Sequence, residues 1–146
     1  MSKFFTNKLA SNQGIPFQYI CRDHTKTGAE AFLRGHNTLV RLSFACDTTL
    51  SKDMLDIYVK EKTGWIDEYL HEVLDDTVLV STKDPLANVI IILEQENMID
   101  VRLMKDVTRH GLQEMFIEDF GPIVTEQTEG KIELAGVDVF EAMAFE

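Results

Sequence analysis

Residues 38–46, TLVRLSFAC, constrain the fold more than any other stretch of this chain. Apolar side chains recur there at every second position: Val40, Leu42, Phe44 and Cys46. This period of two places them on one face of a β-strand, while the polar residues between them point to the other face. The stretch therefore predicts a half-buried strand in a sheet that carries a core on one side.

Two further stretches have the character of strands. Residues 17–22, FQYICR, are rich in β-forming residues, and residues 131–142 read KIELAGVDVFEA. In the second stretch Val137 and Val139 share a face that Glu141 continues. Burying a carboxylate on an apolar face is costly unless it is paired or bound. Glu141 is therefore the acidic residue that most strongly indicates a binding role.

Residues 51–74 have a helical period instead. Their apolar side chains recur at spacings of three, four and seven: Leu55, Val59, Ile66, Leu70 and Val73. Ser51 is a suitable N-cap, and Gly64 is a potential interruption. We expect residues 78–85, VLVSTKDP, to be a loop, whereas 86–97, LANVIIILEQEN, fit a helix or a strand equally well.

The stretch 108–120, TRHGLQEMFIEDF, predicts a second helix with Thr108 as its N-cap. Its buried side would carry Leu112, Met115, Phe116 and Phe120. Two helices cover only one face of so small a sheet, so other subunits would have to cover the other face and the edges. We therefore expect a homo-oligomer.

The composition fits one domain spanning residues 1–146. A net charge of −11 disfavours nucleic acid as a partner, because phosphates would be repelled over most of the surface. No apolar run approaches the twenty residues of a membrane span, and the polar N-terminal stretch does not resemble a signal peptide. We expect a cytoplasmic protein in which Cys21 and Cys46 are free, buried thiols.

With these elements, the chain resembles the 6-pyruvoyl-tetrahydropterin synthase and 6-carboxy-tetrahydropterin synthase family from about Phe17 to Glu141. The motifs that carry the resemblance are RGHNTLVRL, MLDIY, VLDDTVL, TRHGLQE and VDVFE. The resemblance implies an α+β T-fold, with a small antiparallel sheet and two helices packed on one face. It also implies that the sheets join into a barrel on oligomerisation, as a hexamer of stacked trimers.

The family binds zinc through three histidines, of which His24 matches the first and His36 the last. Arg34 stands at the middle position, and a guanidinium cannot ligate a metal. A catalytic zinc needs three protein ligands beside its open position. Glu30 or Asp23 could complete the set; alternatively, Arg34 supplies a fixed positive charge where zinc would stand.

The resemblance also suggests proton-transfer residues. Glu30 occupies the place of the family's cysteine, as in a subgroup thought to redirect side-chain cleavage of the pterin triphosphate; it is a general base or a solvated loop residue. Asp75 and Asp76 match the family's Asp-His pair, so the imidazole of that pair is lost. We interpret His71 as a surface residue and His110 as a residue of a first helical turn.

Glu141 matches the carboxylate that anchors the 2-amino group and ring N–H of a pterin, and Thr108 matches a residue lining the same pocket. The resemblance implies an enzyme acting on 7,8-dihydroneopterin triphosphate or a related pterin. Metal-assisted proton transfer by Glu30 and Asp75 would eliminate the side chain, with His24 and His36 on the metal. The alternative is a T-fold protein that binds a pterin- or purine-like ligand without this chemistry. A third possibility is new chemistry on a purine-like ring.

Overall fold

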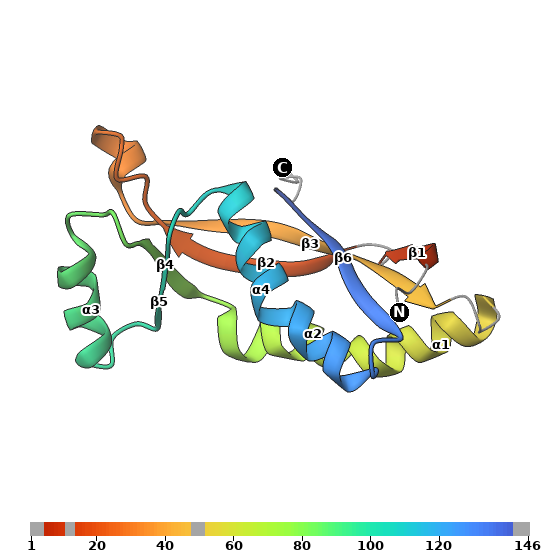
Figure 1. Ribbon diagram of the computed structural model, residues 1–146. Coiled ribbons are helices and arrows are strands. Elements are labelled where there is room, and N and C mark those ends of the chain that lie inside the picture. Colours follow the sequence, from red (N-terminus) through yellow and green to blue (C-terminus); the bar gives the residue numbers. More distant parts are fainter. Residues whose placement is uncertain (1–4, 11–13, 48–51, 142–146) are drawn as a thin grey trace.

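The structure is a computed structural model that describes residues 5–10, 14–47 and 52–141, without the side chains of residues 5–10, 30, 47, 52, 53, 55 and 56. Six strands are present in this part: β1 Phe5–Ala10, β2 Ile15–Cys21, β3 Arg34–Asp47, β4 Thr77–Ser81, β5 Val101–Met104 and β6 Ile132–Glu141. The helical segments are η1 Gly28–Ala31, α1 Lys52–Thr63, α2 Trp65–Tyr69, the π-helical η2 Leu70–Leu74, α3 Ala87–Gln95 and α4 Arg109–Gln127. The chain is an α+β fold built on one curved sheet (Figure 1).

The long strand β3 is the centre of this sheet. One of its edges pairs with β6, and its other edge pairs with β2 in the first half and with β1 in the second. All three pairings are antiparallel. The strand predicted over residues 38–46 is therefore confirmed and extends to Arg34 on its N-terminal side.

The sheet is mixed, which corrects the expectation of an antiparallel sheet. β4 pairs with β2 in parallel, and β5 pairs with β4 in parallel. The helix α3 connects β4 to β5, and a helical crossover returns the chain to the end of the sheet from which it started. A parallel pair is the consequence.

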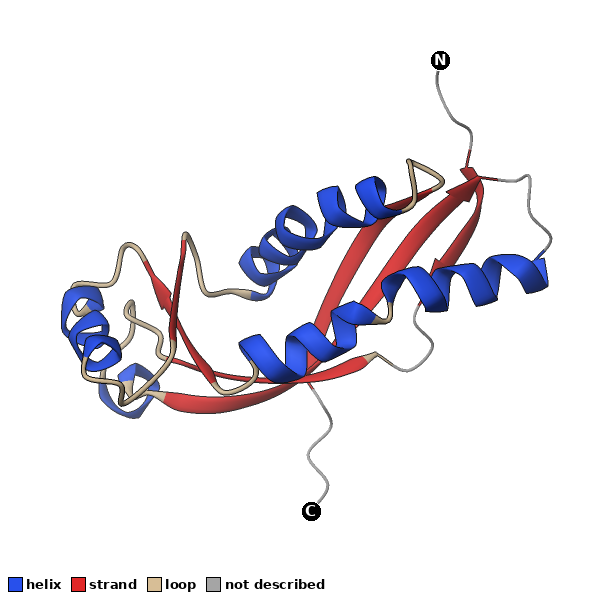
Figure 2. Cartoon of the chain, turned by 90° about the horizontal axis from the view of Figure 1, so that it is seen from below, coloured by secondary structure: helices blue, strands red, loops and turns tan. Residues whose placement is uncertain are grey.

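One face of the sheet packs on α1, α2, η2 and α4 (Figure 2). The alternating residues Val40, Leu42, Phe44 and Cys46 are all buried there. The ring of Phe17 packs edge-on against Phe116, whose ring stacks on Phe120. The predicted buried side of α4 is confirmed, and the side chain of Thr108 caps this helix as expected.

A third helix, α3, packs on β4 and β5 and corrects the expectation of two helices on one face. It contributes Ile90 to a second, smaller core with Val78 and Val80. Leu79, between these two valines, joins the main core instead. β4 therefore has cores on both of its faces, and α3 covers the one that α4 does not.

The buried stripe of residues 51–74 differs from the prediction at its end. Val59, Ile66 and Leu70 are buried as expected, but Val73 is exposed and Leu74 takes its place in the core. The cause is the π-helical turn η2, whose extra residue per turn rotates the following side chains around the helix. The predicted N-cap Ser51 lies outside the described residues.

In the described residues three strands have an unpaired edge, because β5 pairs only with β4, and β1 and β6 each pair only with β3. These edges agree with the expectation that other subunits cover part of the sheet, and the homo-oligomer stays a prediction. Among the helices of the described part, none is long and apolar enough to cross a membrane.

Candidate functional site

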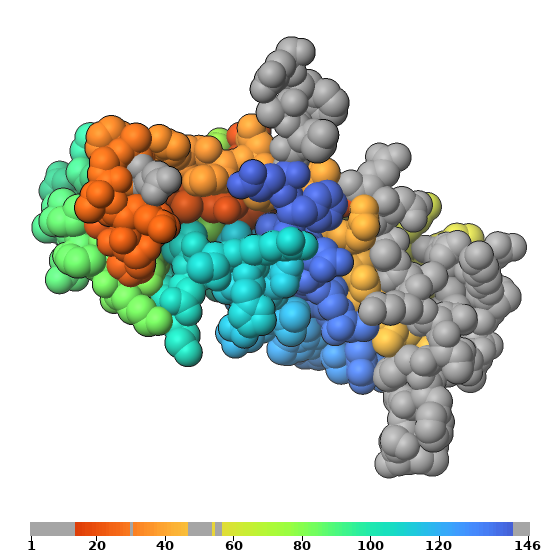
Figure 3. Space-filling view, turned by 90° about the horizontal axis from the view of Figure 1, so that it is seen from above, coloured from red at the N-terminus to blue at the C-terminus, as the bar shows by residue number. Residues whose placement is uncertain are grey.

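A cavity of about 540 Å³ opens at the end of the sheet where β2 and β3 meet the start of α4. Its walls come from β2 and the turn after it, from the segment between η1 and β3, from the N-terminal turn of α4 and from the end of β6. Figure 3 shows this side of the molecule, with the β2–β3 region in orange beside α4 in cyan and β6 in blue. Segments far apart in the sequence therefore share one cavity.

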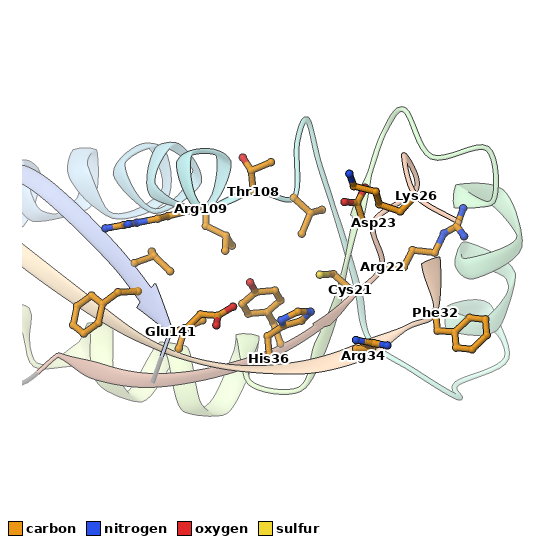
Figure 4. A pocket seen from close by; sticks show the side chains of 16 residues that line it. Cys21, Arg22, Asp23, Lys26, Phe32, Arg34, His36, Thr108, Arg109 and Glu141 are labelled. Carbon is orange, nitrogen blue, oxygen red and sulfur yellow. The ribbon is translucent and has the colours of Figure 1, made fainter. Parts of the chain in front are cut away.

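The floor of the cavity consists of cross-strand neighbours. Antiparallel register pairs Tyr19 with His36 and Cys21 with Arg34, and on the other edge of β3 it pairs Thr38 with Glu141. The rings of Tyr19 and His36 stack with centroids 5.1 Å apart and planes 16° apart. Glu141 and His36 thus lie on the same floor (Figure 4).

The opposite wall is the N-terminal turn of α4. The hydroxyl oxygen of Thr108 accepts a hydrogen bond from the Gly111 amide at 3.0 Å. A Cβ atom at Gly111 would stand 2.0 Å from the carbonyl oxygen of Asp106, so this turn needs glycine in order to pack against the preceding loop. Val107 and Leu112 add apolar surface to this wall.

Two groups on the floor are held in their neutral form. Burial raises the pKa of the Tyr19 hydroxyl to about 12, with smaller contributions from Cys21 and Glu141. Burial likewise raises the pKa of the Cys21 thiol to about 11, and the charge of Asp23 adds to the effect. Both groups are neutral at pH 7 even at their ordinary pKa values of 10.0 and 9.0, and burial keeps the phenol O–H and the thiol protonated to higher pH.

At the far end of the cavity, Arg22 links three segments of the chain by hydrogen bonds. Its Nε and one terminal nitrogen each donate to the Asp84 carboxylate at 2.7 Å, and its other terminal nitrogen donates to the carbonyl of Ala31 at 3.2 Å. Asp84 is almost fully buried. The side-chain hydrogen bonds from Arg22 hold the pKa of the Asp84 carboxyl below its ordinary value. This bridge ties the end of β2 to η1 and to the segment before α3.

The structure brings three of the predicted site residues to this cavity, His36, Thr108 and Glu141. Asp23 and Arg34, the alternatives considered for the metal position, line it as well. His24 lies in the turn after β2 and does not line the cavity, and the side chain of Glu30 is outside the described residues. Asp75 is also outside the cavity. One of its carboxylate oxygens accepts a hydrogen bond from the backbone N–H of Gln18 at 2.8 Å. This bond links the residue that follows η2 to β2.

The described side chains include no group of three His, Cys, Asp or Glu residues that could hold a metal ion. His36 is in the cavity without His24, so the donor set seen in this part of the chain does not match a zinc site with three protein ligands. Zinc on His24 and His36 stays a prediction.

The two other histidines lie on helix surfaces. His71 Nε2 is 2.9 Å from an Asp67 oxygen, and His110 Nε2 is 2.8 Å from a Glu114 oxygen. Both are pairs between residues four apart on one helix, and both histidines are exposed. His110 lies in the first turn of α4, where the sequence indicated, and neither histidine lines the cavity.

Tyr19 and Cys21 belong to the site but were not predicted from the sequence. Their place in the site follows from the register between β2 and β3. In FQYICR, alternate residues share a face, and pairing with the strand that begins at Arg34 sets Tyr19 and Cys21 opposite His36 and Arg34. That register depends on where the connection between β2 and β3 turns, and the sequence leaves this open.

Comparison of the sequence with protein-family models and with curated proteins finds no match. A solved structure has a similar fold. The crystal structure of an uncharacterized protein from Wolinella succinogenes is similar to this chain with a TM-score of 0.67. The two share 12% identity, and the match covers 95% of this chain and 94% of the other. At this identity the likeness concerns the fold alone.

Proposed function

We propose that this chain is a tetrahydropterin synthase-like protein that binds a pterin- or purine-like heterocycle in the cavity over Tyr19 and His36. The observation that carries the proposal is the position of Glu141. Its carboxylate reaches the cavity from the last residue of β6, next to the stacked pair of rings (Figure 4).

The chemistry of the floor suits such a ligand. A carboxylate has two acceptor oxygens, and a pterin or guanine ring offers an amino group and a ring N–H side by side as donors. The stacked rings of Tyr19 and His36 offer the ligand ring aromatic contact, and the neutral Tyr19 hydroxyl can donate to a ring acceptor. Leu112 and Val107 enclose the apolar side of the ring.

Binding without turnover is the function that the geometry supports best. Asp75 is one of the two residues that the resemblance assigns to proton transfer, and it lies outside the cavity, bonded to the backbone of β2. The second candidate is side-chain elimination from 7,8-dihydroneopterin triphosphate. One observation favours it: the imidazole of His36, a group suited to proton transfer near neutral pH, lines the cavity.

The binding proposal is tested by titrating the protein with 6-hydroxymethylpterin and with guanine, followed by calorimetry. Glu141→Gln keeps the size of the side chain but removes one acceptor and the charge. We expect it to weaken binding by about 10- to 100-fold, the effect of losing a charge-assisted hydrogen bond. Glu133→Gln is the matched control, because Glu133 is an exposed glutamate of the same strand that does not line the cavity. Equal affinities of the Glu141 variant and the wild type would show that the site is misassigned.

The elimination is tested separately, by following the consumption of 7,8-dihydroneopterin triphosphate and the metal content of protein purified without added metal. Near-stoichiometric zinc that is lost in a His24→Ala/His36→Ala double variant would support the enzyme. Absence of turnover by the zinc-supplemented protein, while pterins still bind, would leave binding as the function.

A further inference from the structure

The end of β6 that carries Glu141 is held from the side by the helix α4. The Oε1 atom of Gln113 accepts a hydrogen bond from the backbone N–H of Val139 at 3.1 Å. Backbone groups of an antiparallel strand point alternately to its two edges, and β6 pairs with β3 along one of them. Gln113 therefore satisfies a donor on the edge of β6 that no described strand covers.

This hydrogen bond lies next to the proposed ring site at both of its ends. Val139 lines the cavity and lies two residues before Glu141, the last residue of β6. Leu112, which directly precedes Gln113, lines the cavity from the N-terminal part of α4. The bond thus joins the strand that carries Glu141 to the helix that forms the opposite wall (Figure 4).

The position of the Glu141 carboxylate depends on the backbone of β6. Its side chain is exposed, so packing in the core does not hold it in place. The ends of secondary-structure elements open more easily than their centres. A hydrogen bond on the free edge of β6, two residues before Glu141, opposes such opening where it would displace the carboxylate.

The part of α4 that supplies this bond is itself fixed. A Cβ atom at Gly111 would stand 2.0 Å from the carbonyl oxygen of Asp106, so the helix backbone packs closely on the preceding loop there. Gly111 and Gln113 are two residues apart, which places them about 200° apart around the helix axis. The N-terminal part of α4 is therefore held by the loop on one side and by β6 on the other.

We infer that Gln113 is a positioning residue for the ring site, which fixes the end of β6 so that the Glu141 carboxylate faces the donor edge of the ligand. The inference rests on the proposed function, because Glu141 is taken to hold the ring. Gln113 does not line the cavity, so it acts on the ligand through Val139 and Glu141. A strand end that is ordered before the ligand arrives reduces the entropy lost on binding.

The test measures the affinity for 6-hydroxymethylpterin by calorimetry. Gln113→Met keeps the length of the side chain and replaces the amide by a thioether, a weak acceptor. We expect it to weaken binding by about 5- to 10-fold, the effect of losing one ordinary hydrogen bond. Gln113→Glu keeps an acceptor oxygen and should restore the affinity. Gln127→Met is the matched control, because Gln127 is an exposed glutamine at the end of α4 that does not line the cavity.

Two further measurements separate the positioning of Glu141 from a general effect on packing. The amide hydrogen of Val139 should exchange faster in Gln113→Met than in the wild type, and Gln113→Glu should slow it again. In a Glu141→Gln chain, Gln113→Met should weaken binding less than it does in the wild type, because the charge-assisted contact that it positions is already lost. Gln113→Ala also lacks the acceptor and favours the helix, so it replaces Gln113→Met if that variant does not fold.

Equal affinities of Gln113→Met and the wild type, or an unchanged exchange rate at Val139, overturn the inference while the ring site stands. A loss that Gln113→Glu does not restore overturns it as well, and so does a loss that is just as large in the Glu141→Gln chain. Gln113 would then act through the packing of α4. If the wild type does not bind the pterin, or Glu141→Gln binds it equally well, the proposed function itself is wrong.

Discussion

Tyr19 and His36 face each other across β2 and β3, with ring centroids 5.1 Å apart and planes at 16°. Tyr19 also stacks on Phe17, at a centroid distance of 5.6 Å, and Phe17 is fully buried in the core. The floor of the cavity is therefore continuous with the main core. This continuity holds two flat side chains in place before any ligand arrives, which reduces the entropy lost on binding.

The first prediction concerns alkaline pH. Because the pKa of Tyr19 is about 12 in the folded chain and 10.0 ordinarily, the unfolded chain loses this proton at lower pH. The free energy of unfolding should therefore fall as the pH rises from about 10 towards 12, by up to about 1.4 kcal/mol per pH unit. Urea unfolding of the wild type and Tyr19→Phe at several pH values measures the difference. A wild type that loses no more stability than the variant would contradict the assignment.

The second prediction concerns the bridge between Arg22 and Asp84. Arg22→Ala leaves a nearly buried carboxylate with the Leu86 amide as its remaining hydrogen-bond donor among the described contacts. We expect a loss of about 3 kcal/mol in the free energy of unfolding, because an uncompensated buried charge is costly. Adding Asp84→Asn to the Arg22→Ala variant removes the buried charge and should restore part of the lost free energy of unfolding.

The matched control for this bridge is Lys83→Ala. Lys83 and Asp106 form a pair at 3.1 Å, and both side chains are exposed. Exposed pairs contribute about 0–1 kcal/mol, so the control should unfold close to the wild type. If Arg22→Ala lowers the free energy of unfolding in urea no more than Lys83→Ala does, the bridge does not stabilise this end of the cavity.

The third prediction compares two glycines of α4. Gly111→Ala places a Cβ atom 2.0 Å from the Asp106 carbonyl oxygen, so the loop before the helix must shift. We expect a loss of about 1–3 kcal/mol in thermal unfolding, together with weaker ligand binding, because this turn forms a wall of the cavity. Gly121→Ala meets no atom within 4 Å and should stay within about 1 kcal/mol of the wild type. Equal effects of the two substitutions would argue against this packing.

The fold was only partly predictable, and β4 shows why. Its five residues, Thr77–Ser81, are all buried, so the sequence lacks the alternation that identified β3. Burial on both faces removes the period of two, as is usual for parallel strands covered on each side. The expectation of a loop over residues 78–85 was wrong at its start for this reason. Because no strand was predicted there, the parallel pairing of β4 with β2 and β5 was not predicted either.

The sequence by itself determined the apolar face of β3 and the start of α4 at Thr108, because both depend on local period and on one capping side chain. It also indicated Glu141, which does line the cavity, but the expected cost of burial does not apply because the structure leaves this side chain exposed. Only the tertiary structure decided that His36, Thr108 and Glu141 share a cavity while Asp75 lies outside it. The reason is that strand register and helix placement arise from contacts between distant segments, and no local pattern records these contacts.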